Sequence, residues 1–106
     1  MAFKCDIPAV PTILQDDDVV RMTRWDFSPG AVTGWHQHGW PYFVVLLTEW
    51  RMRVHDGEKV AELSFPAGHS YMRPAGVTHD VMNGGQDSAA FVEIEIKNPN
   101  RLAGAV

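Results

Sequence analysis

Glycine and proline punctuate two stretches of this chain at fixed distances from histidine, and this spacing constrains where the chain can turn. The first stretch has Gly30, five further residues, and then His36 and His38. The second has the pattern Gly-x5-Pro-x-Gly-x2-His-x3-Asn, formed by Gly68, Pro74, Gly76, His79 and Asn83. Residues i and i+2 of a strand face the same side. His36 and His38 can therefore present two imidazoles to one ion, and His79 is placed to supply a third.

Short strands are expected from Val19 onward, with no sustained helical periodicity. The expected strands cover residues 19–27, 33–38, 42–48, 50–55, 59–64, 70–73, 78–82 and 89–97. Asp56-Gly57 is a strong hairpin signal, and Asn83-Gly84-Gly85 offers residues that accept positive φ. Many short strands at regular spacing predict a sandwich or a barrel.

Residues 1–18 are expected to form an irregular N-terminal arm ahead of a barrel over 19–106. Pro8 and Pro11 interrupt this arm, and the acidic run 16–18 is interpreted as a solvated turn. Cys5 is the one cysteine of the sequence, so no internal disulfide can form, and we interpret it as an incidental free thiol.

Composition narrows the classes of function. A chain of 106 residues has room for one modest core. A net charge of −4, with nine dispersed Lys and Arg residues, argues against a nucleic-acid partner. The apolar run 42–47 is far too short to span a bilayer, and the N-terminus does not resemble a secretory signal. These features predict a cytoplasmic protein with no membrane role.

Together the two stretches resemble the two motifs of the cupin family, over roughly residues 19–97. The second cupin motif is matched at each fixed position, and the first at Gly30, His36 and His38. The resemblance implies an all-β fold, the double-stranded β-helix or jelly-roll barrel. Among cupins, the chain is similar to small single-domain bacterial proteins, some of them associated with β-alanine degradation.

The first motif then departs from the family pattern. Tyr42 or Phe43 stands where cupins usually carry a metal-binding glutamate, and the closing glycine is missing near Glu49 and Trp50. If Tyr42 points inward, its hydroxyl could contact a metal-bound water or the substrate. Alternatively, Tyr42 is a barrel-wall aromatic that fills the volume of the lost ligand.

The resemblance implies that His36, His38 and His79 bind a divalent metal ion; the alternative is a barrel that has lost its metal. Imidazole suits several transition metals, so the ligand type does not name the ion. Three neutral histidines leave the ion its full double charge, which favours a small anionic, chelating substrate. Some cupin dioxygenases have the same three-histidine arrangement, and the resemblance to them favours Fe²⁺ over Ni²⁺, Zn²⁺ and Mn²⁺ as the bound ion.

Two further residues are candidates for the reaction. Arg73 could hold a substrate carboxylate, or it could pair with a carboxylate of the last strand. In that strand, Glu93 and Glu95 alternate with apolar residues, which is typical of a solvent-facing side. Glu93 could instead enter the pocket as a base or as a partner of Arg73.

Four aromatic residues near these motifs receive more ordinary interpretations. His55 and His69 are expected to be exposed. Trp35 and Trp40 could wall the pocket entrance, or they could serve packing or a dimer contact.

Three functions follow from these residues. The first is an Fe²⁺ dioxygenase of small-molecule metabolism. The second is a metal-dependent isomerase or lyase without redox chemistry, acting on a sugar acid or keto acid. The third is a non-enzymatic barrel that binds a small ligand. A homodimer is expected in each case, because a short chain rich in large apolar residues leaves apolar surface to cover.

Overall fold

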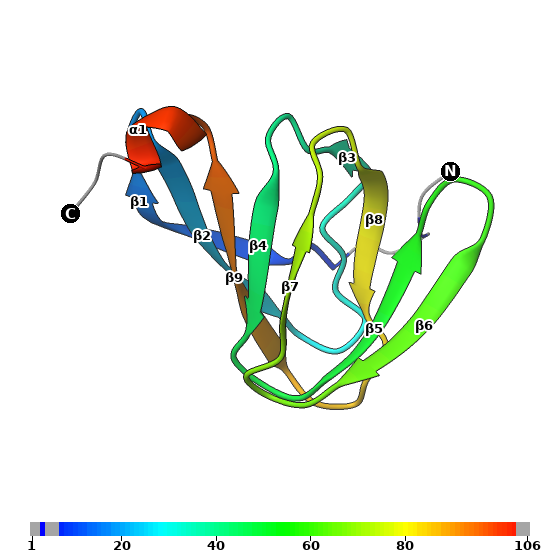
Figure 1. Ribbon diagram of the computed structural model, residues 1–106. Coiled ribbons are helices and arrows are strands. Elements are labelled where there is room, and N and C mark those ends of the chain that lie inside the picture. Colours follow the sequence, from blue (N-terminus) through cyan, green and yellow to red (C-terminus); the bar gives the residue numbers. More distant parts are fainter. Residues whose placement is uncertain (1–2, 4–6, 104–106) are drawn as a thin grey trace.

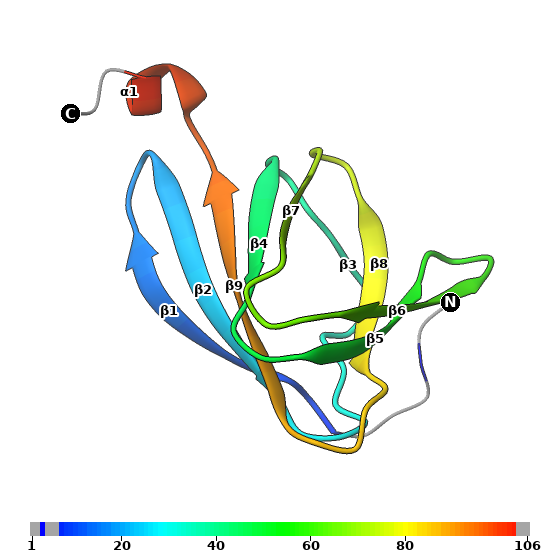
Figure 2. The ribbon, with the colours of Figure 1, turned by 60° about the horizontal axis from the view of Figure 1, so that its bottom comes forward.

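The chain folds into two β-sheets that face each other and enclose a barrel (Figures 1 and 2). The structure is a computed structural model that describes residues 3 and 7–103. The strands are β1 (Val10–Asp16), β2 (Val20–Phe27), β3 (His36–Gln37), β4 (Tyr42–Leu46), β5 (Trp50–His55), β6 (Val60–Phe65), β7 (Ser70–Arg73), β8 (Thr78–Asn83) and β9 (Ala89–Ile96). One sheet has the order β1-β2-β9-β4-β7 and the other the order β3-β8-β5-β6. This arrangement confirms the expected jelly-roll barrel.

The N-terminal segment differs from the expectation of an irregular arm. Val10–Asp16 forms β1, which pairs antiparallel with β2 and extends the five-stranded sheet. All seven residues of β1 are exposed, so no buried face imposed an alternating pattern that could have revealed the strand. Asp16 ends β1, and Asp17 and Asp18 of the acidic run form the expected turn, in which the Asp17 carboxylate accepts hydrogen bonds from the backbone N–H groups of Val19 and Val20. Cys5 lies outside the described residues.

A short helix, α1 (Pro99–Ala103), follows β9 and was also not expected. It is too short to show helical periodicity in the sequence. Arg101 of this helix forms an ion pair with Asp18, which ties the end of the chain to the β1–β2 turn. Within the described part of the chain, no helix is long and apolar enough to cross a membrane.

The motif glycines form turns that other residues would strain. Gly30, Gly68 and Gly76 have φ of 81°, 83° and 94°, a region that costs glycine nothing and other residues much more. Gly84 has no positive φ, so the expected reason for its presence is wrong. A Cβ at Gly84 would lie 2.9 Å from Arg53 Cγ, so the close approach of β5 is what requires glycine there.

The core includes an aromatic cluster formed by β2, β5 and β9. Phe27, Trp50 and Phe91 pack with ring centroids 4.8–5.4 Å apart, and the Trp50 indole N–H donates to the Ala90 carbonyl. Asn83, the last residue of the second motif, is also buried there. Its amide donates to the carbonyls of Phe27, Ser28 and Asp87, and its oxygen accepts from the Gly85 N–H.

Candidate metal centre

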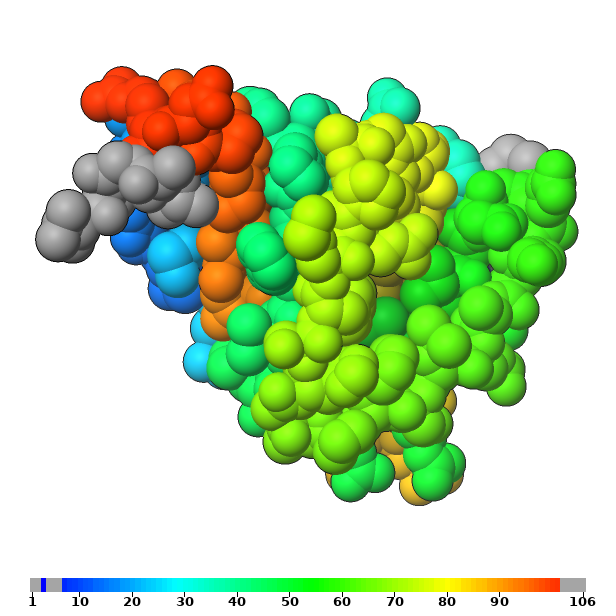
Figure 3. Space-filling model, viewed as in Figure 1, coloured from blue at the N-terminus to red at the C-terminus, as the bar shows by residue number. Residues whose placement is uncertain are grey.

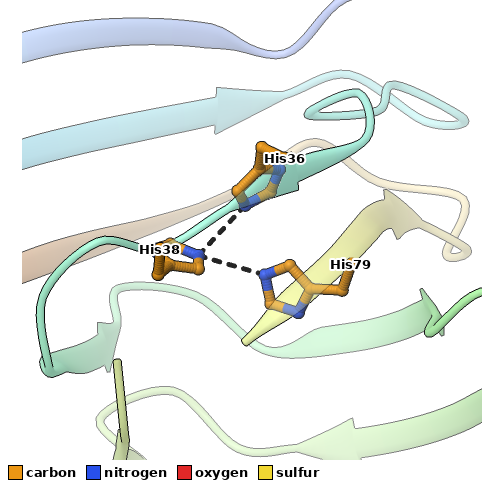
Figure 4. A group of neighbouring side chains, drawn as sticks. All are labelled: His36, His38 and His79. Atoms are coloured by element: carbon orange, nitrogen blue, oxygen red, sulfur yellow. Dashed lines mark hydrogen bonds between the residues drawn. The ribbon is translucent and has the colours of Figure 1, made fainter. Parts of the chain in front are cut away.

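The three motif histidines converge inside the barrel (Figure 4). His36 lies on β3 directly opposite His79 of β8 in the antiparallel register. His38 follows the two-residue strand, yet its backbone continues the pairing, because its N–H donates to Val77 and its carbonyl accepts from Gly76. His36 and His38 therefore face the same side, as i and i+2 spacing predicts.

The geometry of the three rings fits one metal ion. His38 Nε2 lies 3.0 Å from His36 Nε2 and 3.1 Å from His79 Nε2. Metal–imidazole bonds of about 2.0–2.1 Å allow nitrogens at such separations to reach a single ion. The His36 Nδ1 lies 2.7 Å from the Gly34 carbonyl oxygen, which only accepts. Nδ1 therefore carries the proton, and the Nε2 lone pair of His36 faces the centre.

Electrostatics keep two of these histidines in the form that binds metal. Burial is the largest cause that lowers the pKa of His38 to about 4 and of His79 to about 3. The neighbouring His36 and the Arg73 guanidinium lower both values further. Both imidazoles are therefore neutral at pH 7, which is the charge state that binds a cation.

A cavity of about 170 Å³ is lined by two of the three histidines, His36 and His79. Most of its wall is apolar, and its polar lining residues are Thr33, His36, Tyr42, His69, Tyr71, Arg73, His79 and Glu93. It extends to β6 and β7, which are edge strands of the two sheets. The surface is hollowed between these strands in Figure 3, so the seam offers a route for a small molecule.

Tyr42 lines this cavity, whereas Phe43 points away and is 43% exposed. The Tyr42 ring stacks on His38 with centroids 3.9 Å apart. Its hydroxyl is buried and has no hydrogen-bond partner among the described residues. Burial and the Glu93 carboxylate raise the pKa of Tyr42, so the hydroxyl keeps its proton. A buried O–H without a partner leaves a hydrogen bond for a ligand to make.

Arg73 lies at the margin of the cavity, opposite Tyr42 in the β4–β7 pairing. It is exposed, and none of the ion pairs in the described part of the chain involves it. The expected alternative, a pair with a carboxylate of the last strand, is therefore wrong. The guanidinium is available to a small anion that enters from the seam.

Glu93 faces the barrel interior, so the interpretation of a solvent-facing residue is wrong for this position. It is 9% exposed and lines the cavity with His36 and His79. Burial, together with the neighbouring Glu95 carboxylate, raises the pKa of Glu93 to about 7. Carboxylate oxygens of Glu93 and Glu95 lie within 4.8 Å of each other and of a His38 ring nitrogen. Charged and apolar residues alternate along β9 as expected, but the charged residues occupy the inner side.

The two other histidines are less exposed than expected, and the two tryptophans make packing contacts outside the cavity, which is one of their expected roles. His69 is partly buried, lines the cavity and stacks on Phe65 with centroids 4.4 Å apart. His55 is half-buried and contacts Trp35 edge-on. Neither Trp35 nor Trp40 lines the cavity. The cationic groups of Arg21 and Lys97 each lie 5.4 Å from the ring centroid of Trp40. Of these four residues, only His69 lines the cavity. Its position directly after Gly68 gave no indication in the sequence that it would do so.

Asp80 is a further residue that the sequence did not single out. It follows His79 and is 1% exposed. Its carboxylate accepts hydrogen bonds from the backbone N–H of Gly34, at 3.1 Å, and of Phe3, at 3.0 Å. Because the Gly34 carbonyl holds His36, Asp80 fixes the segment that orients a metal-binding candidate.

A jelly-roll barrel with three inward-facing histidines and this pair of motifs defines the cupin class. No family model matches the chain. It is 44% identical over 89 residues to the β-alanine degradation protein BauB of Pseudomonas aeruginosa, covering 84% of this chain and 94% of that protein. A crystal structure of a cupin domain from Bordetella pertussis is 40% identical, with a TM-score of 0.83, covering 87% and 96% of the two chains. A cupin superfamily protein from Desulfitobacterium hafniense shares the fold alone, at 11% identity and a TM-score of 0.68 over 91% and 84%. The chain therefore belongs to the small single-domain cupins.

Proposed function

We propose that the protein is an Fe²⁺-dependent dioxygenase of small-molecule metabolism, with the ion held by His36, His38 and His79. The observation that carries this proposal is the convergence of three imidazoles, two of which line a cavity with unused polar groups. Three neutral ligands leave the ion its double charge and open positions for O₂ and substrate. The cytoplasm is the proposed location, because its reducing environment suits an Fe²⁺ site.

The cavity residues have distinct proposed roles toward the substrate. Arg73 binds a carboxylate of the substrate at the seam. The Tyr42 hydroxyl donates a hydrogen bond to a substrate oxygen, which satisfies its buried donor. Glu93 accepts or holds a proton close to the ion. Apolar side chains around them exclude water from the remainder of a small molecule.

The substrate class is proposed from the charge of the site and from the named relative. A cationic centre with an exposed arginine at its entrance selects a small anion. BauB is named for β-alanine degradation, and we extend that pathway to this chain. The proposed substrate is thus a small anionic metabolite of β-alanine breakdown.

A second candidate is a metal-dependent isomerase or lyase acting on a keto acid or sugar acid. The position of Glu93 supports it, because a buried carboxyl with a pKa near neutrality suits a general base. The metal would then serve as a Lewis acid. Non-enzymatic ligand binding is the remaining possibility, and it is the outcome if neither chemistry is found.

The test starts from the metal content of protein purified without added metal, measured by elemental analysis. The protein is then loaded with Fe²⁺, Ni²⁺, Zn²⁺ or Mn²⁺ and given a panel of small keto acids and hydroxy acids. Oxygen uptake that depends on Fe²⁺ and on substrate supports the dioxygenase. Substrate conversion without oxygen uptake supports the isomerase or lyase. No metal binding at all would refute both.

A further inference from the structure

The proposed metal centre lacks the carboxylate that the first cupin motif usually supplies, and another strand brings a carboxylate to the same region. Tyr42 occupies the motif position, and its ring stacks on His38. It offers a hydroxyl in place of a negative charge. The inference below rests on the proposed function, because it concerns the same three histidines.

The pairing of β4 with β9 places two glutamates beside Tyr42. Tyr42 is opposite Glu95, and Val44 is opposite Glu93. Cross-strand partners project to the same face of a sheet, and Tyr42 and Val44 are both buried inside the barrel. Both carboxylates therefore lie on the inner face, and their oxygens lie within 4.8 Å of each other and of a His38 ring nitrogen.

The two glutamates differ in burial and in neighbours. Glu93 lines the cavity with His36 and His79, and no cation forms an ion pair with it among the described residues. Glu95 is less buried, does not line the cavity, and is paired across the strands with Arg21. Arg21 and Lys97 both act electrostatically on Glu95. A buried carboxylate without a cation is costly, so a cation on the histidines would compensate Glu93 far more than Glu95.

We propose that Glu93 is the charge-balancing carboxylate of the metal centre, supplied from β9 instead of from the first motif. It strengthens the binding of the cation and, by the same negative charge, weakens the binding of anions to it. The effect of Glu93 on both affinities should be large. Two unit charges about 4–6 Å apart near a protein surface have an interaction energy several times the thermal energy.

The experiment compares Co²⁺ binding and azide binding in the wild type, Glu93→Gln and Glu95→Gln. Co²⁺ affinity is measured by competition with a chelator, and azide affinity by absorbance of the cobalt-saturated protein. Glu93→Gln is expected to bind Co²⁺ about tenfold more weakly and azide at least about threefold more tightly. Glu95→Gln, the matched change two residues away, is expected to shift each constant less than about twofold. Glu93→Asp keeps the charge and should retain azide affinity close to that of the wild type.

Opposite shifts of the two constants in Glu93→Gln support the proposal, because loss of structure would weaken both. Unchanged constants in Glu93→Gln, weaker azide binding, or equal shifts in Glu95→Gln would overturn it. These outcomes leave the proposed function standing, provided that the wild type binds Co²⁺. Absence of Co²⁺ binding by the wild type would overturn the proposed function itself.

Discussion

At the scale of single residues, the clearest expectation concerns His79. Its Nε2 lies 3.1 Å from that of His38, and it comes from a different part of the chain than the His36–His38 pair. His79→Ala should lower metal occupancy at least about tenfold, a typical effect of disturbing a metal site. Elemental analysis after dialysis measures this. His55→Ala removes a histidine outside the cavity and should leave the metal content unchanged; equal losses in both variants would contradict the assignment.

The lowered pKa of His79 predicts how the metal-free protein responds to acid. In the unfolded chain this imidazole binds a proton below about pH 6.5, whereas in the folded protein its pKa is about 3. The unfolded state binds more protons in that window, so the contribution of His79 to stability falls as the pH drops below 6.5. Glu93, with its raised pKa, acts in the opposite direction between about pH 4.5 and 7.

A comparison of variants separates the two effects. His79→Gln should lose less stability than the wild type between pH 7 and 5, by at most about 1.4 kcal/mol for each pH unit. Urea unfolding with a chelator present, at a series of pH values, measures the difference. Parallel pH profiles of the two proteins would show that His79 is protonated as readily in the folded state as in the unfolded chain.

The histidines could be predicted from the sequence, whereas much of the cavity could not. Local strand periodicity predicts that His36 and His38 share one face. The spacing of the second motif predicts that His79 joins them. The direction of Glu93 depends on which side of β9 faces the second sheet. Charged and apolar residues alternate regularly along β9, so the sequence alone did not indicate that the charged side faces inward. Arg73 and Tyr42 were candidates. Only tertiary packing shows that, among residues 3 and 7–103, Arg73 has no ion pair and the Tyr42 hydroxyl has no hydrogen-bond partner.

At the scale of elements, Asn83 joins the end of β8 to two other connections. Its side-chain amide donates to the carbonyls of Phe27 and Ser28 at the end of β2 and of Asp87 before β9. Asn83→Ala would leave buried backbone groups unpaired and should lower the free energy of unfolding by about 2–4 kcal/mol. Gln86→Ala, an exposed change in the same connection, should cost less than about 0.5 kcal/mol. Urea denaturation of both variants tests this; similar midpoints would contradict the anchoring role of Asn83.

Most strands were predicted well, whereas β1 and α1 were missed. β2 and β4–β9 match the expected ranges to within one or two residues. Alternation marks the strands that pack on the core. β6 and β7 are mostly exposed, and their positions follow from the turn signals at Asp56-Gly57, Gly68 and Pro74. β3 is shorter than the expected 33–38, since only His36 and Gln37 complete regular pairing with β8. β1 and α1 contribute little buried surface, so their sequences carry no comparable pattern.

At the scale of the whole molecule, the surface of β1 indicates association. Val10, Ile13 and Leu14 are 51–59% exposed, and β1 is the edge of the five-stranded sheet. A long edge strand with exposed apolar side chains is a template for pairing with another chain. We propose that β1 meets its counterpart in a second copy, because antiparallel pairing about a two-fold axis would cover both sets of side chains.

Sedimentation at micromolar concentration should therefore show a species of twice the 11.9 kDa chain mass. Leu14→Glu places a charge in the proposed contact and should shift the equilibrium toward the monomer, because burying an unpaired charge is costly. Met72→Glu is a matched control, since Met72 has a similar exposure (58%, against 51% for Leu14) but lies on β7, at the opposite edge of the same sheet. Dissociation by Met72→Glu, with no effect of Leu14→Glu, would move the interface to the β7 side. A wild type that sediments only as a single chain would refute the dimer, and the exposed aliphatic residues of β1 would then need another partner.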